Sequence, residues 1–429
     1  MIRLLYNLLF PLVFVILLPG FLARMMRRGN FRKDFTQRLA RYTPDLRARF
    51  HDGEWIWVHA VSVGELLVAL KVVDELHRRH PQWRFAVSST TSTAHALAAS
   101  RQSGWLVPVY TPLDFPSIVR RALDAVHPRA VILTESEMWP NFVWMARKRN
   151  IPVLLVNARV SPRSERRYRR FAPVLRSVTR HLSAVGLQEP GHAALWSHLG
   201  LPPDRLHTTG SVKYDPAAAT GAPRDFRGIL HAWGLGQGTP IVLAGSTHDG
   251  EEEILADSLH KIRETIPAAC LILVPRHVER TGAILDRLAA SGFRTARRTN
   301  EPDASAPDIL LIDTTGELSD WYACAHVVFI GKSLAGKGGQ NPVEAILAGR
   351  PVLFGPHMEN FGSLARTLLD AGGAIEVCDA ATLAAAAVDL LSDDTRRTAV
   401  ATRGTGVLHP HRGATARTAD LVESVIGTP

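Results

Sequence analysis

Acidic side chains follow apolar runs in the first half of the chain, where each run is predicted to form a short strand. Glu65 comes after residues 56–58, and Glu135 and Glu137 come after residues 130–134. Parallel α/β sheets bind ligands at the carboxyl ends of their strands, so a carboxylate there is placed to act as a general base. Glu65 also has a structural interpretation, because an acidic residue in the first turn of a helix complements the helix dipole. The pattern leaves both roles open.

The pair Glu135 and Glu137 and the cation Lys213 extend this set. Side chains at positions i and i+2 point the same way in an extended segment and diverge in a turn, so we expect one carboxylate of the pair to face the ligand and the other to be structural. Lys213 stands in a Gly-Ser-Val-Lys-Tyr-Asp segment. A lysine there either stabilises charge that develops on a leaving phosphate or is a solvated linker charge, and both interpretations stay open.

A glycine-rich segment in the second half of the chain predicts half of a nucleotide site. Residues 331–339 follow an apolar run at 327–330 and precede a helix that we expect to start near Pro342. Glycines let backbone N–H groups approach a ligand closely, and a helix N-terminus favours phosphate. Glu344 in the first turn cannot bind phosphate, but it can accept two hydrogen bonds from a ribose diol. The alternative is an ordinary strand–loop–helix unit.

Further polar residues end other predicted strands of this half. Pro275 and Arg276 follow residues 270–274, and residues 316–318 follow residues 309–312. Several polar strand ends beside a glycine-rich loop are hard to explain by packing, and they favour a ligand site. We expect no metal ion, because His and Cys residues are not clustered and no Asp-x-Asp motif ends a strand.

The elements that position these residues alternate between short apolar runs and longer amphipathic segments. This rhythm predicts an α/β fold in which helices cover both faces of a parallel sheet. The rhythm occurs twice, so we expect two doubly wound, Rossmann-like domains that face a central cleft. The predicted strands are residues 56–58, 84–88, 106–110, 130–134, 153–157 and 184–186 in the first domain, and 241–244, 270–274, 309–312, 327–330 and 351–354 in the second.

Composition places the domain boundaries. Residues 202–223 are rich in glycine, proline and alanine, which is typical of an interdomain linker. We predict a membrane anchor over residues 1–24, an acceptor-binding domain over residues 25–212 and a nucleotide-binding domain over residues 213–429. Whether the last helix packs back on the first domain stays open.

The N-terminus is the most apolar part of the chain. Residues 4–22 are almost wholly apolar and are about as long as a bilayer-spanning helix, and a basic run at residues 24–33 follows. The positive-inside rule places this basic flank, and the bulk of the protein, in the cytoplasm. No small-residue cleavage site precedes the basic run, so we expect an uncleaved anchor. Pro11 and Pro19 leave open whether the anchor spans the bilayer or half-inserts.

The net charge of +10 is compatible with three partners, namely nucleic acid, an anionic membrane and phosphorylated substrates. Residues 163–180 are rich in arginine. We favour a surface that meets anionic lipid or substrate phosphate over a merely solvated helix, because the segment after the anchor is basic too. We expect no nucleic-acid binding, since only Tyr168 and Phe171 interrupt these arginines and single-strand binding needs interleaved aromatics.

In this order, the motifs resemble those of the Kdo (3-deoxy-D-manno-octulosonic acid) transferases. The resemblance extends from the N-terminal anchor to Phe361 and so covers nearly the whole chain. Single motifs are weak, but their order is specific. The motifs are His59…Ser62-x-Gly64-Glu65, Thr134-Glu135-x-Glu137-x-Trp139-Pro140-Asn141, Asn157-Ala158-Arg159-x-Ser161, Lys213-Tyr214-Asp215, Gly245-Ser246-Thr247-His248, Pro275-Arg276-His277, Gly316-Glu317-Leu318, Gly339-x-Asn341-Pro342-x-Glu344 and Gly355-Pro356-His357.

The resemblance implies an inverting glycosyltransferase of GT-B architecture. It implies transfer of Kdo from CMP-Kdo to a lipid A precursor (lipid IVA) in lipopolysaccharide core biosynthesis, on the cytoplasmic face of the bacterial inner membrane, with no cofactor or metal. By motif, Glu65 matches the catalytic base, and Glu135 and Lys213 match residues that stabilise the transition state. The positions that match the CMP-binding segments are Pro275, Arg276, Gly316, Glu317, Leu318, Asn341, Pro342, Val343 and Glu344.

Five positions depart from the family pattern. Lys332 and Lys337 add charge to the glycine-rich loop. Ser211 stands where Asn is common, Thr315 where Met is usual, and Gln340 where His is common. These departures affect the detail of donor contacts and remove no catalytic group. The alternative function is that of a soluble-type GT-B sugar-nucleotide epimerase or hydrolase, which would share the nucleotide domain but needs no anchor. The number of Kdo residues added, the acceptor acylation required and the oligomeric state stay open.

Overall fold

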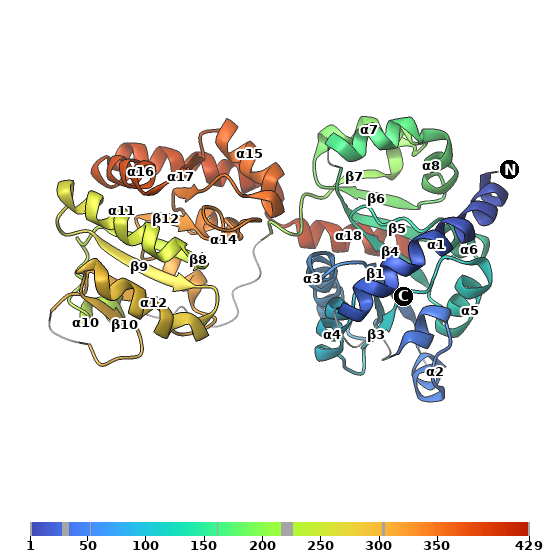
Figure 1. Ribbon diagram of the computed structural model, residues 1–429. Helices are drawn as coiled ribbons and strands as arrows, with labels where there is room; N and C mark the ends of the chain where they lie inside the picture. The colour runs from blue at the N-terminus through green and yellow to red at the C-terminus, as the bar shows by residue number, and fades with distance from the viewer. Residues whose placement is uncertain are drawn as a thin grey trace. The chain divides into compact units, whose positions relative to one another are not determined.

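The chain folds into two compact units (Figure 1), Met1–Asp215 with His411–Pro429 as unit 1 and Pro216–Pro410 as unit 2. Each unit is a sheet covered by helices, and each is described by itself. The structure, a computed structural model, describes residues 2–27, 34–51, 53–160, 162–215, 226–302 and 305–427.

Unit 1 is built on a parallel sheet of seven strands in the order β3-β2-β1-β4-β5-β6-β7. The strand order reverses between β1 and β4, and ligands bind at such a point in sheets of this kind. Neighbouring strands pair in register, so that Trp57 lies between Ala86 and Val131. The strands are β1 (Trp55–Ala60), β2 (Arg84–Ser89), β3 (Leu106–Tyr110), β4 (Ala130–Thr134), β5 (Val153–Ala158), β6 (Ala184–Leu187) and β7 (Leu206–Thr208).

Helices cover both faces of this sheet, because alternate strand residues point to opposite sides. Trp57 and Leu155 belong to an apolar core with α5, α6 and α8, whereas Ile56 and Leu154 belong to a second core with α3, α4 and α18. The C-terminal helix α18 therefore packs in unit 1, beside α3. The helices of unit 1 are α1 (Ile2–Arg27), α2 (Pro44–His51), α3 (Val63–Arg79), α4 (Ser92–Ser100), α5 (Pro116–Val126), α6 (Pro140–Lys148), α7 (Pro162–Arg170), α8 (Ala172–Thr179), α9 (Ala193–His198) and α18 (Ala414–Ile426).

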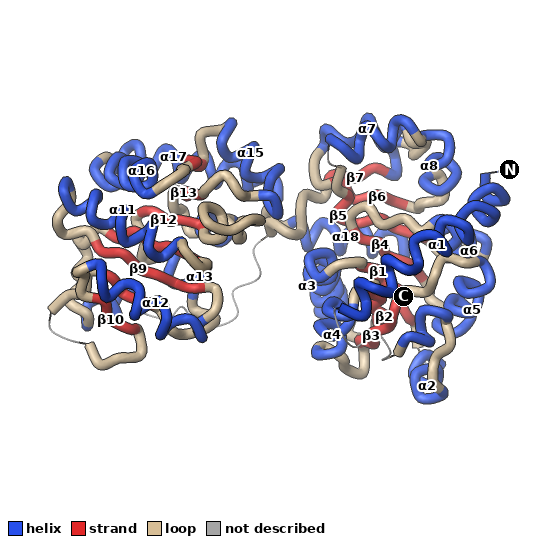
Figure 2. The backbone as a smooth tube through the Cα atoms, in the orientation of Figure 1, coloured by secondary structure: helices blue, strands red, loops and turns tan. Residues whose placement is uncertain are grey.

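Unit 2 repeats this architecture around a second parallel sheet (Figure 2). Its seven strands have the order β10-β11-β9-β8-β12-β13-β14. Here the order reverses between β8 and β12, and α11, α12 and α16 share one apolar core with the sheet. The two sheets confirm the predicted α/β fold class. The elements are α10 (Phe226–Ala232), β8 (Ile241–Thr247), α11 (Glu251–Thr265), β9 (Cys270–Pro275), α12 (Thr281–Leu288), β10 (Thr295–Arg297), β11 (Ile309–Leu311), α13 (Leu318–Tyr322), β12 (Val327–Ile330), α14 (Val343–Leu347), β13 (Val352–Phe354), α15 (Gly362–Asp370), β14 (Ala374–Glu376), α16 (Ala380–Ser392) and α17 (Asp394–Leu408).

Three strands, β7, β10 and β14, are not predicted by the apolar pattern. Each has three residues and lies at an edge of its sheet, where side chains stay partly exposed and need not be apolar. Strand β7 falls within the segment expected to be a linker. That interpretation is wrong for this part of the segment, because Leu206 pairs with Val185 in the sheet. Residues 216–223 of the expected linker lie outside the described residues.

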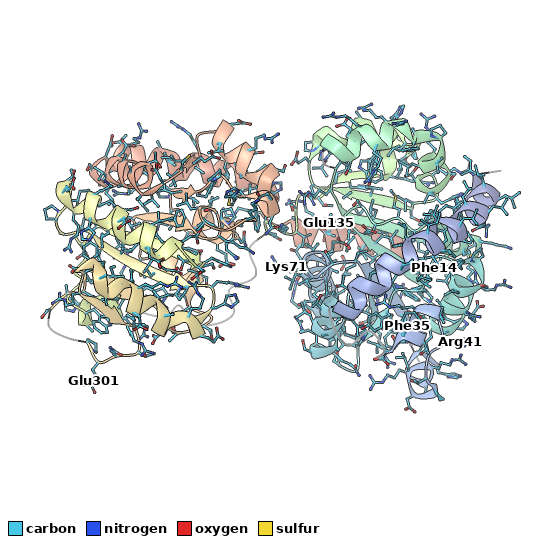
Figure 3. The ribbon with its side chains drawn as sticks, in the orientation of Figure 1. Phe14, Phe35, Arg41, Lys71, Glu135 and Glu301 are labelled. Carbon is cyan, nitrogen blue, oxygen red and sulfur yellow. The ribbon has the colours of Figure 1, made fainter. Side chains whose placement is uncertain are left out.

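The N-terminal helix α1 contains a stretch, Ile2–Gly20, that is long and apolar enough to cross a membrane. One side of this helix lies along unit 1. The Tyr6 hydroxyl donates a hydrogen bond of 2.9 Å to the buried Asp114 carboxylate, and the Phe14 ring (labelled in Figure 3) meets the Phe115 ring edge-on at 5.4 Å. The other side is exposed and apolar, with Leu4 67% and Ile16 75% exposed.

Candidate active site

Glu65 lies just after β1, in the first turn of α3. Ser62 caps this helix: its Oγ accepts a hydrogen bond from the Glu65 N–H at 3.4 Å and donates one to Glu65 Oε1 at 3.1 Å. The other carboxylate oxygen accepts from the Val61 N–H at 2.8 Å. These contacts resemble a capping box and hold the carboxylate in one orientation. The Glu65 residue is only half-buried, so it combines a structural role with access to a ligand.

Glu135 and Glu137 lie in the turn after β4. Glu135 has a left-handed backbone (φ 58°) and donates its N–H to the Val156 carbonyl of β5 at 2.9 Å. Strained non-glycine residues of this kind cluster at functional sites. Burial and then the charge of Glu65 raise the pKa of Glu135, and burial, Glu65 and Glu135 raise the pKa of Glu137 to about 7. Both carboxylates are therefore close enough to Glu65 for its charge to raise their pKa values, and the division of the pair into one ligand-facing and one structural residue stays a prediction.

Two cations lie at the same end of the sheet, beyond the carboxyl-terminal ends of its strands. Arg159 follows β5, and Lys213 follows β7. The charges of both residues act on Glu135 and partly offset the rise in its pKa, while burial and the charge of Arg159 lower the pKa of Lys213. Lys213 is half-buried within unit 1 rather than solvated in a linker. Arg159, which sequence reasoning noted only as part of a motif, therefore belongs to the site.

The segment that carries Lys213 is tied to two helices of unit 1. The Asp215 carboxylate accepts the N–H groups of Gly413 and Thr415, at 2.7 and 2.8 Å, and so caps α18. The Lys71 amine of α3 (labelled in Figure 3) donates to the Asp215 carbonyl at 2.8 Å. Asp215 therefore fixes the position of Lys213 through the backbone, and this use of the Lys-Tyr-Asp motif was not predicted from the sequence.

His59 supports the same end of the sheet from within the core. Its Nε2 accepts a hydrogen bond from Trp139 Nε1 at 3.0 Å, and its Nδ1 lies 2.9 Å from Ser88 Oγ. Burial lowers the pKa of His59 to about 4, so the ring is neutral near pH 7. His59 thus joins the end of β1 to the turn after β4, which carries two of the carboxylates.

The predicted donor-binding residues follow neighbouring strands of unit 2. Pro275 ends β9 and is followed by the exposed Arg276, and residues 316–318 follow the adjacent strand β11. Gly316 has a left-handed backbone (φ 78°), and no atom lies within 4 Å of the place where a Cβ would be. Open space at Gly316 and an exposed guanidinium at Arg276 suit an approaching anionic ligand.

The Glu317 side chain has hydrogen-bond partners within unit 2 instead of facing open space. The Glu317 carboxylate accepts the Thr314 hydroxyl at 2.7 Å and lies 3.4 Å from Trp321 Nε1. Leu318 begins α13, and Glu317 is the N-cap of that helix. The Glu317 side chain therefore has partners in unit 2, and a contribution to ligand binding would come from the backbone of the turn.

The glycine-rich loop is held in place by hydrogen bonds to a buried carboxylate. Glu251, at the start of α11, accepts the N–H groups of Lys332, Ser333 and Leu334 at 2.7, 2.9 and 3.1 Å. The expectation that this loop offers its backbone N–H groups to phosphate is therefore wrong for these three residues. Nothing in the local sequence distinguishes Glu251 from its neighbours, because its partners lie 81 to 83 residues further along the chain.

The glycines of this region serve close packing of backbone segments. A Cβ on Gly331 would collide with the Ser246 carbonyl, and a Cβ on Gly355 would collide with the Ser333 carbonyl. Gly338 has a left-handed backbone (φ 115°) and donates its N–H to the Glu359 carboxylate at 2.6 Å. The glycines thus bring the ends of β8, β12 and β13 together at the point where the strand order reverses.

The helix predicted near Pro342 is α14, and Pro342 is its N-cap. Asn341 Oδ1 accepts the Val343 N–H at 3.1 Å, and Glu344 is exposed in the first turn as expected. The helix has only five residues, so its dipole is weaker than that of a full-length helix.

Unit 1 therefore presents three carboxylates and two cations at the carboxyl-terminal ends of its strands. Unit 2 presents an exposed arginine, a glycine with open space beside it and an exposed glutamate. The first set can take a proton and stabilise developing charge. The second set can bind a phosphate and a ribose. Within the ranges that the structure describes, no group of three or more His, Cys, Asp and Glu side chains is arranged to hold a metal ion.

Comparison with known proteins decides the class of reaction. Residues 33–216 match the family described as 3-deoxy-D-manno-octulosonic-acid transferase (kdotransferase). A 3-deoxy-D-manno-octulosonic acid transferase of Haemophilus influenzae is 33% identical over 392 residues, which cover 91% of each chain. The chain belongs to the Kdo transferase family. A Kdo transferase of Bordetella pertussis is 35% identical over 382 residues, which cover 87% of each chain.

Solved structures confirm that this Kdo transferase has a GT-B-like fold. A putative UDP-N-acetylglucosamine 2-epimerase from Listeria monocytogenes aligns with a TM-score of 0.53 and 14% identity over 87% of this chain and 96% of that chain. A glycotransferase of kitacinnamycin aligns with a TM-score of 0.52 and 16% identity over 87% and 99%. At such identities the likeness concerns the fold alone.

The prediction of a Kdo glycosyltransferase is confirmed by the family, and the alternative of an epimerase or hydrolase is set aside. Fold likeness would not have separated the two, because an epimerase and a glycosyltransferase match this chain about equally well. The roles of individual site residues stay predictions.

Proposed function

We propose that this Kdo transferase takes Kdo from CMP-Kdo and transfers it to a lipid A precursor in lipopolysaccharide core synthesis. The observation that carries the proposal is the charge cluster of unit 1. Glu65 and Glu135 follow β1 and β4, between which the strand order reverses, and the charges of Arg159 and Lys213 act on Glu135. Sugar transfer from a phosphate-linked donor needs a base for the acceptor hydroxyl and positive charge for the departing phosphate. This cluster supplies both.

Glu65 is the base in this proposal. Its carboxylate is already oriented by Val61 and Ser62, so little freedom is lost when an acceptor hydroxyl binds. Glu65 takes the proton of the acceptor hydroxyl, whose oxygen bonds to the anomeric carbon of Kdo as the bond to the CMP phosphate breaks on the opposite side, so the configuration inverts. Lys213 and Glu135 stabilise the transition state, the lysine by meeting phosphate charge and the carboxylate by meeting the positive charge of an oxocarbenium-like sugar. No residue role here requires a metal ion.

Unit 2 binds CMP in this proposal. Arg276 contributes an exposed cation for the phosphate, and Gly316 lets the backbone of its turn approach the nucleotide closely. Glu344 accepts the ribose hydroxyls, and Asn341 positions it by fixing the start of α14. The remaining residues assigned to this site from the sequence, Pro275, Glu317, Leu318, Pro342 and Val343, shape the turns that carry these groups.

We further propose that α1 attaches the enzyme to the cytoplasmic face of the inner membrane by half-insertion. Tyr6 and Asn7 are bonded to Asp114 and Asn141 of unit 1, so a helix that crossed the bilayer would carry these buried polar groups into hydrocarbon. The exposed apolar side of α1 is free to enter the lipid. The basic segment after the helix lies mostly outside the described residues.

Incubation of the full-length protein with CMP-Kdo and a lipid A precursor, with product masses read by mass spectrometry, tests the proposed reaction. The expected products are CMP and an acceptor heavier by one or more Kdo residues. Release of CMP with free Kdo, or no change in the acceptor mass, would contradict the proposed acceptor.

A further inference from the structure

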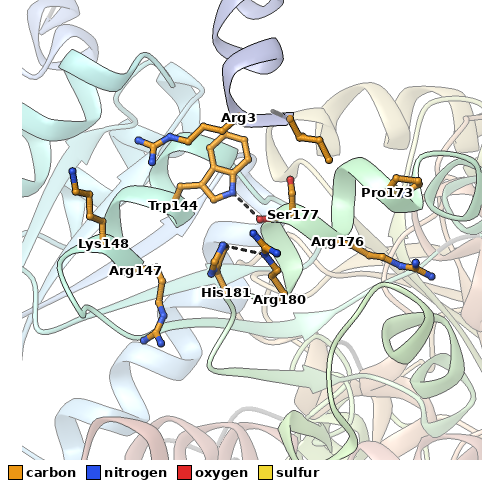
Figure 4. A pocket seen from close by; sticks show the side chains of 10 residues that line it. Arg3, Trp144, Arg147, Lys148, Pro173, Arg176, Ser177, Arg180 and His181 are labelled. Carbon is orange, nitrogen blue, oxygen red and sulfur yellow. Dashed lines mark hydrogen bonds between the residues drawn. The ribbon is translucent and has the colours of Figure 1, made fainter.

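A basic pocket lies beside the N-terminal end of α1 (Figure 4). Its volume is about 620 Å³, and its walls come from α1, from the C-terminal part of α6 and from α8 with the turn after it. Trp144 forms one wall, where its indole N–H donates to the Ser177 carbonyl at 2.8 Å. We call it the N-terminal basic pocket. Its basic lining residues are Arg3, Arg147, Lys148, Arg176, Arg180 and His181, and no acidic residue lines it.

The positive charge of this pocket is largely unneutralised. Arg147, Lys148 and Arg180 are exposed, and none of the three forms an ion pair with a carboxylate among the residues that the structure describes. Burial together with the charges of Arg180 and Arg147 lowers the pKa of His181. Cations at helix C-termini also complement helix dipoles, which accounts for Arg147 and Lys148 singly. It does not account for six basic side chains around one concavity without a carboxylate.

The pocket is separate from the candidate active site. Helix α6 begins at Pro140, three residues after Glu137, and ends at Lys148 beside the pocket. The two sites therefore lie at opposite ends of this helix. Neither Glu65 nor Lys213 lines the pocket.

The pocket adjoins the apolar surface of α1. Ile2 and Arg3 line it, and the exposed apolar side of the helix begins at Leu4 and Leu5, which are 67% and 54% exposed. The Arg3 guanidinium lies over the Trp144 ring, 5.8 Å from its centre, and so is held at the junction of helix and pocket. An apolar surface beside a basic concavity matches a lipid, which has acyl chains beside an anionic headgroup.

We propose that the N-terminal basic pocket binds the phosphate headgroup of an anionic phospholipid in the membrane surface that α1 enters. The acyl chains of that lipid would lie along the exposed side of α1. The bound headgroup would give unit 1 a second point of attachment beside α1 and so fix its orientation on the membrane.

Vesicle flotation of the full-length protein tests this proposal, with vesicles of phosphatidylcholine alone and of phosphatidylcholine with about 30% phosphatidylglycerol. The pocket variant combines Arg147→Gln, Lys148→Gln and Arg180→Gln. A control variant of equal charge combines the exposed Arg294→Gln, Arg366→Gln and Arg403→Gln of unit 2. Thermal melting of each variant checks that the fold is intact.

Wild type is expected to favour the phosphatidylglycerol vesicles, and the pocket variant is expected to lose this preference by at least about tenfold, since each basic residue near an anionic surface adds to binding. The control variant should stay within about twofold of wild type, and all three should keep the weaker binding to phosphatidylcholine. An equal loss in both variants would show general charge attraction and overturn the proposal. The proposal also fails if both variants bind like wild type. Stabilisation of wild type, but not of the pocket variant, by inorganic phosphate, with unchanged vesicle binding, would assign the pocket to a soluble anion instead.

Discussion

At the residue scale, three carboxylates lie close together at the carboxyl-terminal ends of the strands of unit 1. Their mutual repulsion contributes to a raised pKa of Glu137. Its pKa rises from 4.5 to about 7, with burial as the largest cause, followed by the charges of Glu65 and Glu135. The folded protein therefore binds a proton here that the unfolded chain releases between these two values. The stability that this proton confers is complete below about pH 4.5 and is lost as the pH rises through about 7.

We predict that Glu137→Gln removes this pH dependence, because glutamine does not ionise. The melting temperature of the variant minus that of wild type should increase from pH 4.5 to pH 7 and level off above. The corresponding difference in the free energy of unfolding between variant and wild type should grow by at most about 1.4 kcal/mol per pH unit. The growth should be smaller in practice, since Glu137 is not fully buried. Melting curves across this pH range, measured in one buffer series, provide the check. A difference that does not change with pH would mean that Glu137 ionises as in the unfolded chain.

Sequence motifs located the residues at strand ends but not the residues that hold them. Glu65, Glu135 and Arg276 were found because each follows an apolar run. Asp215 caps a helix nearly 200 residues away, and Glu251 binds a loop more than 80 residues away. Such long-range contacts leave no local signature, and only the folded chain brings the partners together.

At the scale of elements, the glycine-rich loop depends on α11 through Glu251. A buried carboxylate that accepts several backbone N–H groups cannot be replaced without leaving donors unsatisfied. We predict that Glu251→Gln lowers the free energy of unfolding by about 2–4 kcal/mol and weakens CMP binding, because the loop loses its support. The exposed Glu264→Gln on the same helix is the control and should change neither. Calorimetric melting and CMP titration of both variants test this prediction. Equal stability and equal CMP affinity of the two variants would mean that the loop keeps its conformation without the Glu251 carboxylate.

The two sides of α1 should have separable roles. Leu8→Ser with Ile16→Ser changes the exposed side and should weaken membrane association at least about tenfold with an unchanged melting temperature, because each apolar side chain contributes roughly 1.5–3 kcal/mol on burial. Tyr6→Phe removes the hydrogen bond to Asp114, so it should lower the melting temperature and leave membrane association unchanged. Membrane pelleting and melting curves test this. If the serine pair lowers the melting temperature as much as Tyr6→Phe does, the two sides are not distinct.

Element prediction succeeded where the pattern is strongest. The predicted apolar runs of both sheets are strands, since the central strands of a parallel sheet are buried on both faces. The edge strands β7, β10 and β14 have no such run, because edge positions tolerate polar and exposed residues. The contact of one side of α1 with unit 1 was also not predicted, because the partners of Tyr6 and Asn7 lie more than 100 residues further along the chain.

At the scale of the whole molecule, each unit has its own sheet and its own apolar core. We predict that a fragment of residues 216–410 folds alone and binds CMP within about threefold of the full-length affinity. Glu344→Ala in the same fragment should bind more weakly, since hydrogen bonds to a charged group contribute about 1.5–3 kcal/mol each. Calorimetry of CMP binding checks both. A folded fragment without CMP affinity would place part of the nucleotide site in unit 1.

The most direct test of the account is Kdo transfer by Glu65→Gln beside Ser62→Ala. Glutamine cannot take the acceptor proton, so transfer should fall by about 10²–10⁴-fold while CMP-Kdo binding changes little. Ser62→Ala removes the helix cap, at a cost of about 0.5–2 kcal/mol in stability, and one of the two contacts that orient Glu65. The carboxylate and its hydrogen bond from the Val61 N–H remain, so transfer should fall far less than in Glu65→Gln. Transfer by Glu65→Gln within a few-fold of wild type, or an equal loss in both variants, would show that Glu65 only supports the Ser62 cap of α3. Glu135 would then be the next candidate for the base.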